Sequence, residues 1–258
     1  MRPNTLRAIW SSNTAAINGW LHVPSSWSAE LMAHQGYDSL TVDLEHGLVD
    51  YLAAVPMMQA ISTTSVIPMA RVPWNEPGII MKLLDAGAYG IICPMIETAD
   101  ECARFVGACR YHPHGYRSLG PTRARVWAGA DYEQGANDEV VTFAMVETGR
   151  ALENIDAIVA VPGLTGVYIG PGDLSLSLGL TKRLDNDEPR FLTAADRIRA
   201  AAEAPGLVAG IHANSEAYAS LMIGRGFRLV TVMSDTTLLG TMARQTVAAV
   251  RAGMAQPT

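Results

Sequence analysis

The chain alternates short apolar, β-branched runs with segments of helical periodicity along almost its whole length. The strand-like runs are Ile17–His22, Ser39–Leu44, Val66–Val72, Tyr89–Pro94, Val140–Val146, Gly166–Ile169, Leu207–Ile211 and Phe227–Val232. Strand-then-helix order predicts a parallel sheet, because parallel strands need crossover connections. Eight such units favour an α/β fold that closes into a (β/α)8 TIM barrel.

Helical patterns separate these runs. A first helix opens at Ser25 or Ser28, and the later ones cover Tyr51–Ile61, Pro77–Ala86, Ala99–Arg110, Arg190–Glu203, Glu216–Arg225 and Thr236–Arg251. Residues 111–137 lack strong periodicity, and a loop this long in a compact domain is usually functional. No Gly-x-Gly-x-x-Gly motif follows the first strand, which weakens a dinucleotide-binding interpretation.

Length and composition fit one barrel domain over residues 1–258, with 49% apolar and 17% charged residues. The net charge is −6 and no Lys/Arg run is present, so a small-molecule substrate is expected rather than nucleic acid. Neither an apolar signal-peptide core nor a membrane-length apolar stretch is visible in the sequence. The three cysteines form no C-x-x-C pair, which favours a reducing compartment. We therefore expect a cytoplasmic protein.

Charged residues recur where the predicted strands end. Asp43, Glu45 and His46 follow the second strand, Arg71 ends the third, and Glu147 and Asp173 follow the fifth and sixth. In a TIM barrel, catalytic side chains project from the carboxyl ends of the strands. Charges beside such apolar strands must be paired or bind a metal. The sequence therefore predicts an active site at this end of the barrel.

Glu147 and Asp173 come from neighbouring strands and have few basic neighbours in the sequence. Two such carboxylates repel unless a divalent ion or a shared proton relieves them, and oxygen ligands suit Mg²⁺ or Mn²⁺. The alternative is that Glu147 caps a helix and Asp173 caps the turn over 174–178. The spacing alone does not decide between a metal site and helix capping.

His46 lies close to Asp43 and Glu45, which could set its basicity near neutral pH; the alternative is a solvated loop histidine. Arg71 could offer its fork of donors to a keto oxygen or a carboxylate, or form a salt bridge to Glu45 or Asp43. The other histidines fit no zinc spacing.

The Gly170-Pro171-Gly172 turn precedes a helix start. Amides at a helix start attract anions, so a substrate carboxylate could rest on the N–H groups of Gly172 and Asp173. The alternative is a turn that only changes the direction of the chain.

Taken together, several motifs resemble one known family. The matching segments are Ser28–Leu31, Val42–His46, Arg71–Asn75, Lys82–Gly87, Val146–Thr148, Ile169–Ser175 and Asp235–Leu239. The chain resembles the class II pyruvate aldolases of the HpcH/HpaI aldolase/citrate lyase family, in the phosphoenolpyruvate/pyruvate barrel superfamily. The segments run in order along nearly the whole chain.

The resemblance implies a role for each matching residue. Glu147 and Asp173 would bind Mg²⁺, Mn²⁺ or Co²⁺, and His46, paired with Asp43, would be the general base. Arg71 would hold the keto oxygen of the substrate, and the Gly172 and Asp173 amides would receive its carboxylate. Trp20 would line the pocket, and Asp85 would come from a neighbouring subunit. The family implies a homohexamer, a dimer of trimers, in which the last helix, Thr236–Arg251, is exchanged between subunits.

The implied reaction is reversible cleavage of a 4-hydroxy-2-oxo acid to pyruvate and an aldehyde, with oxaloacetate decarboxylation as a side activity, in the catabolism of aromatic or sugar acids. Neither Lys82 nor Lys182 ends a strand, which disfavours a Schiff-base mechanism. Two departures surround the site: Met145 replaces a glutamine of the type member, and Pro121 removes a hydroxyl from the pocket. These two departures predict an aldehyde that differs from the one used by the type member.

Two other functions are compatible with a barrel of this kind. An acyl-CoA lyase of the malyl- or citramalyl-CoA kind would need a basic patch for the phosphates, for which the chain offers Arg117, Arg123 and Arg125. A non-catalytic binding barrel has no need of charged strand ends. The aldolase is the favoured interpretation.

Overall fold

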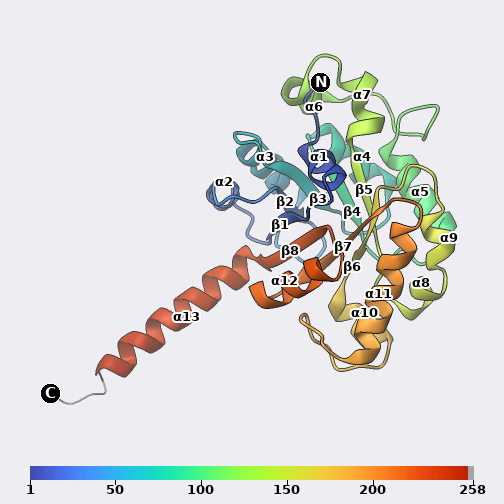
Figure 1. Ribbon diagram of the computed structural model, residues 1–258. Coiled ribbons are helices and arrows are strands. Elements are labelled where there is room, and N and C mark those ends of the chain that lie inside the picture. The colour runs from blue at the N-terminus through green and yellow to red at the C-terminus, as the bar shows by residue number, and fades with distance from the viewer. Residues whose placement is uncertain (255–258) are drawn as a thin grey trace.

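Eight parallel strands pair in sequence order and close into a barrel in the computed structural model, which describes residues 1–254 (Figure 1). The strands are β1 Ala16–Leu21, β2 Ser39–Asp43, β3 Ile67–Arg71, β4 Gly90–Cys93, β5 Val141–Met145, β6 Gly166–Ile169, β7 Val208–Ala213 and β8 Leu229–Ser234. The predicted (β/α)8 fold is confirmed, and each predicted strand ends within about two residues of the observed one.

The helices surround this barrel. They are α1 Thr5–Ser11, α2 Ser26–Ala33, α3 Tyr51–Ile61, α4 Pro77–Asp85, α5 Ala99–Cys109, α6 Thr122–Ala128, α7 Tyr132–Glu139, α8 Gly149–Glu153, α9 Ile155–Val159, α10 Pro171–Ser177, α11 Pro189–Glu203, α12 Glu216–Gly224 and α13 Asp235–Met254. Local signals account for several starts. The Ser25 hydroxyl accepts from the amide of Ser28, and the Asp50 carboxylate accepts from the amide of Ala53.

Helices α1, α6 and α7 were not predicted. The Asn4 side chain caps α1 by accepting from the amide of Leu6, and Leu6 is buried in the cluster that fills the barrel. This short helix is held by that contact rather than by a periodicity visible in the sequence. Helices α6 and α7 lie within the segment that was predicted to lack periodicity.

Aromatic side chains fill the barrel. Trp20, Tyr89, Phe143 and Tyr168 are buried inside it, while a separate apolar cluster packs the strands against the outer helices. The Cβ of an alanine at position 166 would lie 2.5 Å from Cε1 of Phe143, so Gly166 makes room for that ring. The interior is therefore a packed core, in which the buried Asn18 and Tyr168 both donate hydrogen bonds to Thr231.

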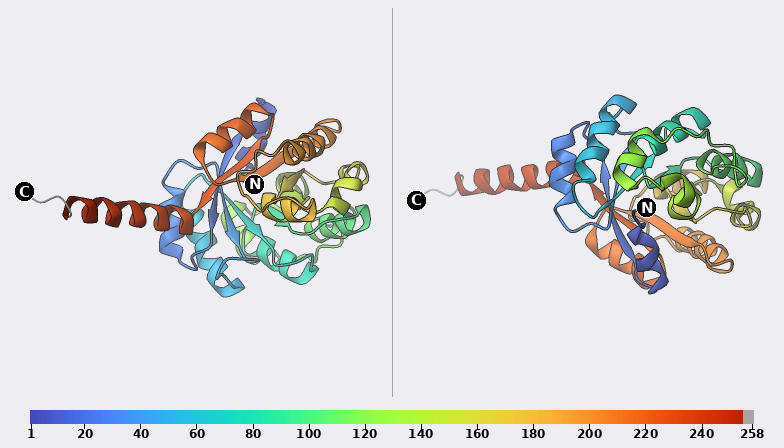
Figure 2. Two further views of the ribbon diagram at one scale, coloured as in Figure 1. Left: turned by 90° about the horizontal axis from the view of Figure 1, so that it is seen from below. Right: turned by 90° about the horizontal axis from the view of Figure 1, so that it is seen from above.

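Helix α13 leaves the barrel and projects away from it (Figures 1 and 2). Within it only Asp235 is buried, whereas Leu239, Met242, Val247 and Val250 are exposed. None of the helices within residues 1–254 is long and apolar enough to cross a membrane.

Candidate functional site

The strand register places Asp43 of β2 directly beside Arg71 of β3. Arg71 donates from Nε to Oδ1 of Asp43 at 2.8 Å and from Nη2 to Oδ2 at 2.6 Å. Nη1 of Arg71 lies 2.7 Å from Oε2 of Glu45. Both salt bridges weighed for Arg71 are therefore present together. Each terminal nitrogen of the guanidinium still keeps a second N–H group that can meet a substrate oxygen.

The Asp43 carboxylate is a fully buried hub. Oδ2 also accepts from Nε1 of Trp20 at 3.1 Å and lies 2.9 Å from Nε2 of His22, while Oδ1 accepts from the backbone amides of Glu45 and His46. Burial would raise the pKa of Asp43, but the hydrogen bonds from His22 and Arg71 and the charge of Arg71 outweigh it. They hold the pKa well below its usual range, so Asp43 stays ionised.

The ring of His46 does not occupy the place the sequence suggested. It is 65% exposed, its Nε2 lies 3.9 Å from Oε2 of Glu45, and only its backbone amide bonds Asp43. The imidazole on Asp43 belongs to His22, which fits no zinc spacing in the sequence and was not a predicted site residue. The available signal was its position, because His22 directly follows β1 and so also stands at a strand end.

Trp20 forms the floor beneath this ion pair. Cζ of Arg71 lies 4.9 Å from the indole centroid, Tyr168 stacks on the indole, and the His212 ring meets it edge-on at 5.2 Å. Burial lowers the pKa of His212 to about 4, so that imidazole is neutral at ordinary pH. The floor of the site is therefore rigid and aromatic.

Glu147 is buried just beyond β5. Its Oε1 accepts from the amide of Met95 at 2.8 Å, and a Cβ at Gly170 would lie 2.3 Å from Oε2, so only glycine leaves room for this carboxylate. Burial raises the pKa of Glu147 to about 7, and the charges of Glu45 and Asp173 raise it further against the opposing amide bond. A buried, repelled carboxylate of this kind is stabilised by a cation.

Neither carboxylate acts as a helix cap. Helix α8 is capped by Thr148, whose hydroxyl accepts from the amide of Ala151, and the N-cap of α10 is Gly170. Asp173 lies in the first turn of α10 with its side chain exposed. The capping alternative weighed for Glu147 and Asp173 is therefore wrong.

The donor set at this point consists of two carboxylates. Within residues 1–254, no group of three or more His, Cys, Asp or Glu side chains is arranged to hold a metal ion. Mg²⁺ is commonly bound by one or two carboxylates while water and substrate complete its octahedron. Glu147 and Asp173 fit that kind of site rather than a closed protein cage.

The start of α10 lies next to a lysine. Gly172 is buried, and a Cβ built on it would lie 3.5 Å from Cε of Lys182. A positive side chain beside helix-start amides suits a carboxylate. This place of Lys182 beside Gly172 has no signature in the sequence, and the residue was not among the predicted site residues.

Asp85 and Pro121 lie at the opposite, amino-terminal end of the same barrel. Asp85 ends α4 and accepts from Nη2 of the buried Arg117 at 2.7 Å, while Pro121 precedes α6 in the connection from α5 to β5. Figure 1 shows α6 and α10 at opposite ends of the molecule. Within one chain, therefore, neither residue lies with Asp43 and Glu147.

The three cysteines are buried and free. Burial raises the pKa of Cys102 and Cys109 to about 12, which leaves them as thiols. All three pack in the apolar cluster between the strands and the outer helices.

Comparison with known proteins gives consistent results. The model of the HpcH/HpaI aldolase/citrate lyase family matches residues 19–240. A hydroxypyruvate/pyruvate aldolase of Rhizorhabdus wittichii is 40% identical over 96% of the chain and 99% of its own length. A 4-hydroxy-2-oxo-heptane-1,7-dioate aldolase of Salmonella dublin is 36% identical over 92% of the chain and 90% of its own length.

Solved structures agree with this result. An HpcH/HpaI aldolase/citrate lyase family protein from Burkholderia cenocepacia is 34% identical, with a TM-score of 0.89 over 96% of this chain and 99% of that one.

Proposed function

The chain belongs to the HpcH/HpaI aldolase/citrate lyase family, and from that premise we propose that its strand-end site reversibly cleaves a 4-hydroxy-2-oxo acid to pyruvate and an aldehyde. The protein is a carbon–carbon lyase of the class II aldolase type. The observation that carries the reaction is the grouping of Arg71 with Asp43 beside the buried carboxylate of Glu147. It combines a donor for an oxyanion with a site for a cation.

A divalent metal, Mg²⁺, Mn²⁺ or Co²⁺, would be held by Glu147 and Asp173. When bound, it supplies Lewis-acid stabilisation of the negative charge that develops on the 2-oxo acid. The second N–H groups of Arg71 donate to the keto oxygen, where negative charge grows during cleavage. The amides of Gly172 and Asp173 receive the carboxylate, and the Lys182 side chain adds positive charge nearby.

His46 is the proposed base that takes the proton from the 4-hydroxyl group. Its ring is exposed beside Glu45, so it can approach a bound substrate. Both ring nitrogens of His22 are engaged, by Asp43 and by Thr236, so His22 is the poorer candidate. Asp43 acts on His46 through the backbone amide, which fixes the loop rather than the ring.

Different residues would bind the oxo-acid part of the substrate and its aldehyde part. The relative from Rhizorhabdus wittichii is named for hydroxypyruvate as well as pyruvate, and hydroxypyruvate keeps the oxo-acid group that Arg71 and Gly172 would bind. Met145 lies next to the cation site, because a Cβ at Gly170 would meet both Oε2 of Glu147 and Cε of Met145, whereas Pro121 lies at the far barrel end. We therefore propose an aldehyde acceptor that differs from the semialdehyde of the type member, within aromatic or sugar acid catabolism.

The proposed assembly is a homohexamer, a dimer of trimers, in the cytoplasm. It would bring Asp85 and Pro121 of one subunit to the strand ends of another, and it would cover the exposed apolar residues of α13 by exchange between subunits. Free cysteines agree with a reducing compartment.

The three arginines that would bind the phosphates in an acyl-CoA lyase are engaged within the chain. Arg117 is buried against Asp85, Arg123 donates to the carbonyl of Ala86, and Arg125 pairs with Glu133. A binding barrel without chemistry is disfavoured by the aldolase relatives.

The function is tested by incubating purified protein with 4-hydroxy-2-oxo acids and with oxaloacetate, with and without Mg²⁺ or Mn²⁺, and measuring released pyruvate. We expect metal-dependent release from both substrate classes. Release that survives complete chelation would contradict the cation site, and no release from any 4-hydroxy-2-oxo acid would contradict the aldol reaction.

A further inference from the structure

His212 lies near the carboxyl end of β7 and has no part in the aldol reaction described so far. Two residues earlier, a Cβ at Gly210 would lie 2.7 Å from Cδ2 of Tyr168, a ring buried inside the barrel. Because alternate residues of a strand share a face, His212 also points into the barrel. Its ring meets the indole of Trp20 edge-on at 5.2 Å, and the same indole lies under Arg71. His212 therefore belongs to the wall of the site that contains Arg71.

The ring nitrogens of His212 are free to meet a ligand. The residue is partly exposed, and the buried side-chain atoms that lack a hydrogen-bond partner within residues 1–254 do not include its two nitrogens. The neighbouring His22 differs, because its Nε2 lies 2.9 Å from Oδ2 of Asp43 and its Nδ1 lies 3.2 Å from Oγ1 of Thr236. Of these two imidazoles, His212 is the one with hydrogen-bonding capacity left for a substrate.

The His212 ring is uncharged. Burial lowers its pKa to about 4, and the nearby Arg71 and His22 lower it further against the charge of Asp43. A neutral imidazole has one N–H donor and one acceptor nitrogen. It therefore matches a hydroxyl group, which also donates and accepts, and it offers no positive charge to a carboxylate.

The proposed contacts to pyruvate come from one arc of the barrel mouth. Arg71 ends β3 and Glu147 follows β5, while Gly172 and Asp173 lie in the first turn of α10, after β6. The strands pair in sequence order around the closed barrel, so β7, β8, β1 and β2 form the other arc. The substrate carbons beyond C3 extend toward this second arc. His212 stands at its beginning, because β7 pairs with β6.

The charges at the mouth disfavour a second carboxylate on the aldehyde part. Arg71 already pairs with Asp43 and Glu45, and the charge of Glu147 also acts on it. A carboxylate placed over His212 would meet these like charges beside an imidazole that cannot balance it. A hydroxyl group at the same place carries no such cost.

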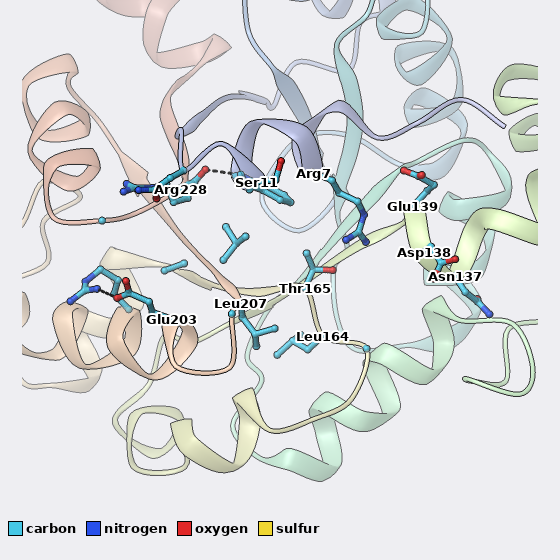
Figure 3. A pocket seen from close by; sticks show the side chains of 18 of the residues that line it. Arg7, Ser11, Asn137, Asp138, Glu139, Leu164, Thr165, Glu203, Leu207 and Arg228 are labelled. Carbon is cyan, nitrogen blue, oxygen red and sulfur yellow. Dashed lines mark hydrogen bonds and ion pairs between the residues drawn. The ribbon is translucent and has the colours of Figure 1, made fainter.

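The cavity of about 810 Å³ at the opposite, amino-terminal end of the barrel has no comparable free group. Its arginines already face acids. Glu203 pairs with Arg199, and Figure 3 shows Asp138 and Glu139 on the same side of the cavity as Arg7. The nitrogens of Arg7 and Arg199 that lack a partner within the described part of the chain are buried, whereas those of His212 are accessible.

We propose that His212 selects the aldehyde by forming a hydrogen bond with a hydroxyl group on the carbon next to the aldehyde carbon. The preferred substrates are then 4,5-dihydroxy-2-oxo acids, which release pyruvate and a 2-hydroxyaldehyde. This inference rests on the proposed aldol function and adds to it the class of the aldehyde. His212 contacts the C5 hydroxyl group and not the C3–C4 bond that breaks, so it determines specificity.

The test compares two substrates that differ by one hydroxyl group. 4,5-Dihydroxy-2-oxopentanoate releases glycolaldehyde, and 4-hydroxy-2-oxopentanoate releases acetaldehyde; pyruvate is measured for both with Mg²⁺ present. We expect wild-type kcat/KM to favour the dihydroxy acid. His212→Phe keeps an aromatic ring against Trp20 but has no ring nitrogen, so it should lower the ratio of the two kcat/KM values by about tenfold, the loss of one hydrogen bond. The dihydroxy acid cyclises to the same extent in every assay, so the change in ratio between variants reports the enzyme.

Further variants separate a hydrogen bond from a change in shape. His212→Leu should lower the ratio as His212→Phe does, and His212→Gln, which keeps a donor and an acceptor, should recover part of it. His34→Leu, at the exposed end of α2, is the control and should keep the wild-type ratio. An unchanged ratio in a folded His212→Phe or His212→Leu variant, with both acids cleaved, would overturn the role of His212 and leave the aldol function standing. Wild-type protein that cleaves neither acid would overturn both.

Discussion

Nε2 of His22 lies 2.9 Å from Oδ2 of Asp43, and Nδ1 of the same ring lies 3.2 Å from Oγ1 of Thr236. One imidazole thus bridges the hub carboxylate on β2 and the root of the projecting helix α13. The Asp235 carboxylate strengthens this junction by accepting from the amides of His22 and Val23.

His22 should therefore act as a positioning residue. We expect His22→Leu to lower kcat by about tenfold with little change in KM, because Asp43 loses a hydrogen bond that helps to align Arg71. His22→Gln, which can still donate to Asp43, should recover most of the loss. His34→Leu, at the exposed end of α2, is the control. Equal rates in all three variants would remove His22 from the site.

His46→Ala should separate two reactions of the same site. Aldol cleavage needs a base for the 4-hydroxyl proton, so its kcat should fall by about a hundredfold or more. Oxaloacetate decarboxylation removes no hydroxyl proton and should fall far less. Steady-state assays of both reactions on one preparation measure the ratio, and equal losses would show that His46 is not the base.

Glu147→Ala and Asp173→Ala should each reduce pyruvate release by more than about a hundredfold at ordinary metal concentrations, since each removes one of only two carboxylate ligands. Raising the Mg²⁺ or Mn²⁺ concentration should recover part of the activity. Glu153→Ala, at the end of α8, serves as a control for charge removal. Near-wild-type turnover in either site variant would disprove the ligand assignment.

The raised pKa of Glu147 predicts how stability depends on pH without metal. Its pKa is about 7 in the folded chain against an ordinary value of 4.5, so between these values the folded state holds the proton and the unfolded state does not. Glu147 therefore contributes about 3 kcal/mol to the free energy of unfolding below pH 4.5, and this contribution is lost as the pH rises through 7.

Chemical denaturation of the chelated protein at pH 5 and pH 8 measures this difference. Glu147→Gln should remove most of the fall in the free energy of unfolding, and saturating Mg²⁺ should also reduce it because the cation stabilises the carboxylate. A wild-type pH dependence that persists unchanged in Glu147→Gln would point to other groups.

Asp85 should act across a subunit boundary. Asp85→Asn and Glu147→Gln should each be nearly inactive alone, but subunits mixed by unfolding and refolding together should recover about a quarter of wild-type activity. This fraction is the share of sites that combine an intact Glu147 with an intact Asp85 from the next chain. No recovery in demonstrably mixed oligomers would place both residues in the same subunit.

The barrel and the cluster of charged strand-end residues could be predicted from the sequence, because the strand pattern shows which residues lie at the carboxyl ends of the strands. His22 was not, since its contact with Asp43 depends on the pairing of Leu21 with Val42 between β1 and β2. The capping roles considered for Glu147 and Asp173 could be rejected only once Thr148 and Gly170 were seen at those positions.

Helix α1 escaped prediction for a similar reason. Its stability comes from Leu6, which packs among residues that are distant in the sequence, and a seven-residue segment gives too short a window for periodicity. Composition likewise gave no sign that Arg7, Arg110 and Arg199 gather around one cavity.

The placement of Asp85 and Pro121 at one pole of the barrel, and of Asp43 and Glu147 at the other, has a geometric consequence for assembly. If one pole completes the other, the two surfaces can meet reciprocally in a two-fold dimer or head to tail, and head-to-tail contacts either close into a ring or grow without limit. A closed ring of subunits would leave no pole unmatched. Catalytic activity would then require the assembled subunits. A chain isolated by dilution would carry one part of each of two sites and no complete site.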